Sequence, residues 1–225
     1  MLLLFGRKKL KILLSTILVS CIEIKTLLLV PAVSYAQKFK ELVPYLQQIG
    51  YTDDEINSIE KIVEEAVSSE LPEKYLCQRI KEGISKKVEY IMLYTTLIDR
   101  ISKLRIAKVL ITKLFREDLR KDMEYSVTFL SELLEAGFPI YTIVKLGGVA
   151  SSANVSSKEF VGYVELLKIA KLNKVPEKIA INIISEAISK KQPYKEAKER
   201  IVKARLQCIK EEITKEYTEK KLINR

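Results

Sequence analysis

Residues 72–91 read PEKYLCQRIKEGISKKVEYI, and residues 176–195 read PEKIAINIISEAISKKQPYK. Aligned without a gap, the two stretches are identical at ten of twenty positions. Two unrelated amphipathic helices would share Lys, Glu and Ile by chance, but they would not share the combined spacing of Pro, Ser-Lys-Lys and Tyr. The repetition therefore predicts a duplicated structural unit.

Each stretch belongs to a longer unit that begins with the same helix-start signal. Thr52-Asp53-Asp54-Glu55 and Ser156-Ser157-Lys158-Glu159 match a capping box, in which a hydroxyl and a carboxylate satisfy free backbone amides. Apolar residues then recur at helical spacing: Ile56, Ile59, Val63 and Ala66 in one copy, and Phe160, Tyr163, Leu167 and Ala170 in the other. Pro72 and Pro176 open a second helix at its first position, where the missing amide costs nothing. We interpret residues 52–91 and 156–195 as copies of one helix–turn–helix unit of about 40 residues, which is within the size range of solenoid repeats.

The other segments beyond residue 37 also indicate helices, because β-branched residues recur at helical spacing instead of alternating. We expect helices within residues 37–49, from Tyr90 to about Arg120, over Tyr125–Ala136 and from Tyr194 to about Lys220. The closing helix carries an apolar stripe that must pack on something, formed by Val202, Leu206, Ile209 and Ile213. Gly147–Ser157 is rich in small residues and predicts a loop and the only hinge. The predicted fold of residues 37–225 is all-α, a right-handed-type helical repeat or solenoid-like bundle built from the duplicated unit.

Residues 1–36 differ from the rest and resemble a secretory signal. A basic cluster containing Arg7 precedes two apolar runs, Ile12–Ile22 and Thr26–Val33, and Ser34-Tyr35-Ala36 places small residues where signal peptidase requires them. We predict export with cleavage after Ala36. Two alternatives are a lipobox at Leu18-Val19-Ser20-Cys21, with Cys21 lipidated, and an uncleaved membrane-associated helix. Neither apolar run alone reaches the roughly 20 residues that span a bilayer.

Composition excludes several function classes. The 225 residues carry a formal net charge of +10, with no His, no Trp and three Cys. Without His, the chain lacks the commonest general base and the commonest zinc ligand, and its cysteines form no Cys-x-x-Cys pair. Removal of residues 1–36 takes away five basic residues and one acidic residue, which lowers the net charge to +6. The remaining charges alternate in sign, a pattern typical of solvated helix faces.

Three candidate sites receive a structural interpretation. Gly147-Gly148 lacks the spacing of a phosphate-binding loop, and no strand precedes it. Acidic residues such as Asp53 and Asp54 lie in a first helical turn, where they complement the helix dipole. Cys77 and Cys208 would be the thiols left after cleavage and could pair in an oxidising compartment. Because Cys77 aligns with Ile181, a small buried hydrophobic role is the simpler expectation. We predict no catalytic residues, no metal site and no cofactor.

The candidate binding residues are two lysine pairs at equivalent places near the ends of the units, Lys86-Lys87 and Lys190-Lys191. Cations near a helix C-terminus complement its dipole, and the same residues on one surface would contact an acidic protein or anionic lipid. We therefore expect an exported helical-repeat protein of the bacterial cell envelope, periplasmic or membrane-tethered, that acts as a non-enzymatic binding or scaffold module. Its partner would be another envelope protein or the anionic membrane surface, with no small-molecule substrate. The alternative is a cytoplasmic basic helical protein that binds nucleic acid, supported by the pI of about 9.3.

Overall fold

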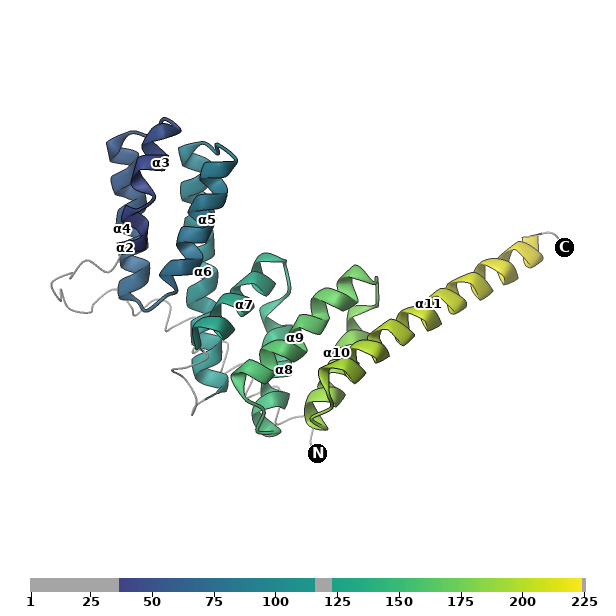
Figure 1. The fold of residues 1–225 in the computed structure, drawn as a ribbon. Coiled ribbons are helices and arrows are strands. Elements are labelled where there is room, and N and C mark those ends of the chain that lie inside the picture. Colours follow the sequence, from purple (N-terminus) through teal and green to yellow (C-terminus); the bar gives the residue numbers. More distant parts are fainter. Residues whose placement is uncertain (1–36, 116–122, 224–225) are drawn as a thin grey trace.

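The computed structural model describes residues 37–115 and 123–223, and these residues form helices and no strands, which confirms the all-α prediction (Figure 1). The helices are α2 (Gln37–Lys40), α3 (Val43–Gln48), α4 (Asp53–Ser68), α5 (Glu73–Ser85), α6 (Tyr90–Leu114), α7 (Met123–Glu135), α8 (Ile140–Ser152), α9 (Ser157–Leu172), α10 (Glu177–Ser189) and α11 (Tyr194–Ile223). The predicted signal segment, with Ala36 and Cys21, lies outside the described residues.

The starts of α4 and α9 follow from local sequence. The Thr52 hydroxyl accepts a hydrogen bond from the Glu55 amide at 3.3 Å, and the Glu55 carboxylate accepts one from the Thr52 amide at 2.8 Å. The same reciprocal pair joins Ser156 and Glu159, so both predicted capping boxes are present. The two helix pairs α4–α5 and α9–α10 have bounds that coincide after a shift of 104 residues.

The two prolines lie one residue earlier in their helices than predicted. Pro72 and Pro176 are the N-cap residues of α5 and α10, with extended ψ angles of 102° and 134°, and so precede the first helical position. The physical basis of the prediction is unchanged, because a residue at either position has no intrahelical partner for its backbone amide.

One turn geometry ends most of the helices. The residue after the C-cap has a positive φ angle at Gly50, Glu70, Lys87, Gly137, Asn154, Lys174 and Lys191. The next amide then bonds back to the last turn of the helix, as in Val88 N–H to Gly83 O at 3.0 Å and Gln192 N–H to Ala187 O at 2.9 Å. This hydrogen bond is the Schellman pattern, and it reverses the chain within about four residues.

The burial pattern matches over a longer stretch than the predicted units. Shifted by 104 residues, α2 and α3 together coincide with α8, and α6 begins where α11 begins. Residues 104 positions apart are both buried in six pairs: Phe39 with Ile143, Leu42 with Leu146, Leu46 with Ala150, Ile59 with Tyr163, Ile80 with Ile184 and Leu97 with Ile201. The correspondence therefore covers the helix before each predicted unit and the start of the helix after it.

Two hydrophobic clusters form the core, and α6 crosses from one to the other. Leu93 and Leu97 pack into the N-terminal cluster with residues of α2 to α5, whereas Leu104 and Leu110 pack into the larger cluster that extends to Ile201. Buried apolar residues recur along the whole length of α6, which suits this position because each half is covered by different neighbours.

From α3 onward, successive helices run in alternating directions (Figure 1). The helices pack mainly on the next helix and the one after it. Figure 1 shows an extended arrangement in which the turn between α5 and α6 lies at the top and the turn between α10 and α11 lies at the bottom. The last helix, α11, projects away from the other helices for much of its length (Figure 1).

The loop predicted at Gly147–Ser157 is wrong for its first half. Gly147 and Gly148 lie inside α8, which continues to Ser152, and only residues 153–156 form a turn. Gly147 is required by a close helix crossing, because a methyl group built on it would lie 2.5 Å from Leu114 Cδ1 in α6. Gly147 therefore marks a packing contact instead of a hinge.

Candidate functional site

Both lysine pairs occupy helix-ending turns and are exposed. Lys86 and Lys190 are the C-caps of α5 and α10, and Lys87 and Lys191 adopt the left-handed backbone conformation with φ of 48° in each case. Their equivalence therefore has a backbone cause as well as an electrostatic one, because the turn needs a residue at positive φ at this position.

A tyrosine hydroxyl holds each of these turns in place. Tyr51 donates a hydrogen bond to the Val88 carbonyl and Tyr163 donates one to the Gln192 carbonyl, both at 2.6 Å. The two carbonyls are equivalent, although the tyrosines come from different positions in the two copies. Burial raises the pKa of both hydroxyls, so they remain donors at neutral pH. The lysines thus extend from well-anchored turns.

The structure does not bring the two lysine pairs together. Figure 1 places the α5–α6 turn and the α10–α11 turn at opposite ends of the molecule. Direction alternates from α5 onward, and α10 is the fifth helix after α5, so α10 runs opposite to α5 (Figure 1). One continuous surface containing all four lysines is therefore absent from the described part of the chain.

The second pair is involved in local ion pairs. Lys190 Nζ lies 2.6 Å from Glu186 Oε1, Arg200 in α11 also pairs with Glu186, and Lys191 Nζ donates to the Asn154 carbonyl at 3.2 Å. Hydrogen bonds from Lys190, which has the larger effect, and from Arg200 lower the pKa of Glu186 to about 2. These contacts join the end of α10 to α11 and to the turn after α8.

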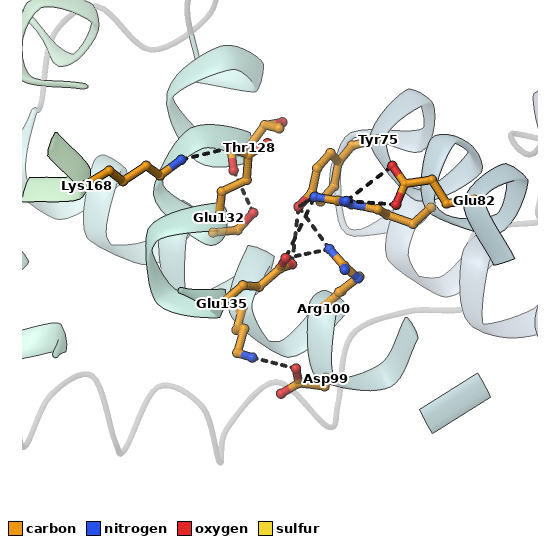
Figure 2. A network of polar contacts seen from close by, with 11 residues as sticks. Tyr75, Glu82, Asp99, Arg100, Thr128, Glu132, Glu135 and Lys168 are labelled. Carbon is orange, nitrogen blue, oxygen red and sulfur yellow. Dashed lines mark hydrogen bonds and ion pairs between the residues drawn. The ribbon is translucent and has the colours of Figure 1, made fainter. Parts of the chain in front are cut away.

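A partly buried polar network lies where α5, α6 and α7 meet, and sequence reasoning missed it (Figure 2). The Glu135 carboxylate accepts hydrogen bonds from Arg100 at 2.5 Å and from the Tyr75 hydroxyl at 3.2 Å. Arg79 donates to the same hydroxyl at 3.1 Å and pairs with Glu82 at 2.9 Å. Burial alone would lower the pKa of Arg79, but its hydrogen bonds to Tyr75 and Glu82 raise it, so the guanidinium stays charged.

This network joins the two halves of the molecule. Its members are distant in sequence, since Arg100 and Glu135 are 35 residues apart and Tyr75 and Glu135 are 60 apart. The side chains of Arg100 and Glu135 are only 18% and 17% exposed, so removal of either partner would leave a charge poorly solvated. No local pattern marks these residues, because charged side chains are also common elsewhere in α5, α6 and α7.

An open depression between α8 and α10 has a volume of about 410 Å³ and is lined by Tyr141, Lys145, Glu177, Lys178, Ile181 and Asn182. Glu177 accepts a hydrogen bond from Thr142 at 3.0 Å, near the N-terminus of α8. The equivalent Glu73 accepts from the amides of Lys38 and Phe39 at the start of α2, at 2.8 and 3.3 Å. The carboxylate therefore fastens two helices in each copy, and the depression is a surface feature beside this contact.

Both described cysteines are free thiols. Cys77 is buried in the N-terminal cluster, as expected for a small hydrophobic residue, and burial raises its pKa to about 11. Cys208 is half-buried on α11. No helix in residues 37–115 and 123–223 is long and apolar enough to cross a membrane, and no acidic, His or Cys cluster in those residues is placed to hold a metal ion.

The outer face of α11 carries an exposed apolar stripe. Val202, Leu206 and Ile213 are 41%, 55% and 61% exposed, and Ile209 is half-buried. The sequence predicts this stripe, but only the structure shows that the described residues leave it uncovered. Comparison of the chain with protein-family models, curated proteins and solved structures found no match.

Proposed function

We propose that the protein is a helical-repeat scaffold, exported to the bacterial cell envelope, that binds other macromolecules without catalysing a reaction. The observation that carries this proposal is the match between the two halves in helix bounds, capping boxes and buried positions after a shift of 104 residues. In helical-repeat proteins, each unit covers the apolar face of its neighbour, and the extended surface that results is used for binding.

Local packing supports the repeat interpretation. Helices in the described residues mainly contact those one or two places away in the chain, and their arrangement is extended (Figure 1). Anchored turns at the ends of the helix pairs present charged side chains from fixed backbone. These turns are the places where an acidic partner would bind a cationic side chain without rearrangement of the fold.

Export rests on residues 1–36 and is tested by the mature N-terminus. Intact-mass measurement of the protein purified from its native host should give a chain that begins at Gln37. A chain that retains Met1, or one that begins at a lipidated Cys21, would contradict cleavage after Ala36.

Binding through the lysine turns is tested by charge reversal at each end of the molecule. We expect cross-linking capture from envelope extracts to fall severalfold with the double variant Lys86→Glu and Lys87→Glu or with the variant Lys190→Glu and Lys191→Glu. The two turns lie far apart, so each double variant is the matched control for the other. If neither double variant changes the capture, the lysine turns are excluded as the binding surface. If the protein is found in the cytoplasm and captures nucleic acid, a nucleic-acid-binding function is favoured.

A further inference from the structure

Helix α11 has two sections with different environments. Ala197 and Ile201 are buried in the larger cluster and fix the start of the helix. Beyond Ile201 the helix projects from the body (Figure 1), and its apolar stripe of Val202, Leu206, Ile209 and Ile213 faces no other described element closely enough to be buried.

The exposed stripe is not the remnant of a face that a further repeat would cover. In α6, Ile101, Leu104 and Ala107 are buried in the larger cluster, which also contains α7 residues. The residues of α11 at the same positions are Arg205, Cys208 and Glu211. The apolar side chains of α11 therefore lie on a different face of the helix from the one that α6 buries, and this face needs a different kind of partner.

From this pattern we infer that α11 pairs with α11 of a second copy of the chain, in antiparallel orientation. The four apolar residues are spaced by four, three and four positions, a pattern that reads the same in both directions. A two-fold symmetric interface requires this kind of self-complementary surface. In the pair, Leu206 packs against Ile209 of the second copy, and Val202 packs against Ile213 of the second copy, so all four side chains are covered.

Charge determines the orientation. Residues that flank an apolar seam of this type set partner choice and direction. In the antiparallel pair, Arg205 lies beside Glu212 of the second copy, and symmetry repeats this contact. Within one chain the two side chains already form an ion pair at 3.2 Å, with 23% and 62% of each side chain exposed.

A parallel pair would instead place Arg205 beside Lys210 of the second copy and would form no pair of opposite charges along this seam. The antiparallel pair does bring Lys203 close to Lys210 of the second copy on its other flank. Salt screens this repulsion as well as the attraction between Arg205 and Glu212. Raising the salt concentration should therefore weaken the dimer less than the Arg205 contact alone would predict.

The inference is independent of export and of partner capture, because it concerns the purified protein. In sedimentation equilibrium, the purified chain should show a monomer–dimer equilibrium at protein concentrations below about 100 µM. Leu206→Ser should raise the dimer dissociation constant by about tenfold or more, since it removes an apolar contact twice in the symmetric interface. The matched control is Leu172→Ser, because Leu172 is 82% exposed on α9 and lies outside the seam.

Charge exchange tests the orientation. Arg205→Glu should weaken the dimer severalfold, and the double variant Arg205→Glu and Glu212→Arg should restore it. Both residues are on the projecting section, and a thermal melt by circular dichroism checks that each variant is folded. A monomer at every concentration, a dimer that Leu206→Ser does not weaken, or a dimer that Arg205→Glu tightens would each overturn the antiparallel α11 pair.

Discussion

Gly83 in α5 lies against Leu93 in α6. This contact allows the equivalence of the two halves to be tested, by giving the first half the residues that the second half has at these two positions. A methyl group built on Gly83 would lie 2.8 Å from Leu93 Cδ1 and 3.5 Å from Cδ2. The equivalent residues 104 positions later are Ala187 and Ala197, both fully buried. One copy therefore combines Gly with Leu at the place where the other combines two alanines.

We expect Gly83→Ala to lower the free energy of unfolding by up to about 2 kcal/mol. Forcing a methyl group into a packed contact costs about 1–3 kcal/mol, and the higher helix propensity of Ala offsets about 1 kcal/mol of that. In a Leu93→Ala background the overlap is gone, so the same change should raise the free energy of unfolding by about 1 kcal/mol. The coupling between the two substitutions is then about 1–3 kcal/mol.

Urea unfolding of the wild type, both single variants and the double variant, followed by circular dichroism, measures this coupling. Leu93→Ala alone should cost about 2–5 kcal/mol because it leaves a cavity in the N-terminal cluster. If Gly83→Ala has the same sign in both backgrounds and the coupling is below about 0.5 kcal/mol, the two positions do not compensate in volume and the reasoning fails.

Three further predictions concern single sites. Gly147→Ala should destabilise the protein by up to about 2 kcal/mol, because its methyl would meet Leu114 Cδ1 at 2.5 Å at a cost of about 1–3 kcal/mol and the helix propensity of Ala offsets about 1 kcal/mol. Gly148→Ala, with no atom within 4 Å, should instead stabilise it by about 0.5–1 kcal/mol. Thermal melts that fail to separate the two variants would contradict the close crossing. Iodoacetamide should alkylate Cys208 before Cys77 in the folded protein, because burial raises the pKa of Cys77 to about 11, and peptide mass spectrometry should show this order. Hydrogen bonds, the largest effect coming from Lys190, lower the pKa of Glu186 from 4.5 to about 2. The ionised group therefore stabilises the fold above pH 4.5, and this stabilisation is lost as the pH falls toward 2. In urea melts, the stability difference between wild type and Glu186→Gln should shrink over that range.

Helix starts and ends could be predicted from the sequence because the interactions that fix them are local. Thr52 and Glu55 are three residues apart, as are Ser156 and Glu159, so each capping box is complete within a single turn of chain. The buried stripes were predictable for the same reason, since residues three or four apart share a helix face.

The errors and omissions arose where contacts are distant in sequence. Gly147 indicates a loop when its neighbours alone are considered, but it lies inside α8. It is glycine because Leu114 of another helix occupies the space of a side chain. Arg100 and Glu135 carry no signal of burial, and they meet because α6 and α7 pack together.

The candidate binding residues show the same division. The sequence by itself determined that Lys87 and Lys191 end equivalent helices, because the turn that reverses the chain is specified within a few residues. Only the tertiary structure decided that they lie at opposite ends of the molecule, because helix direction alternates along the chain and α10 runs opposite to α5 (Figure 1). Likewise the apolar spacing of α11 can be read from the sequence, but its exposure depends on which helices pack beside it, and those packing contacts are set by the fold as a whole.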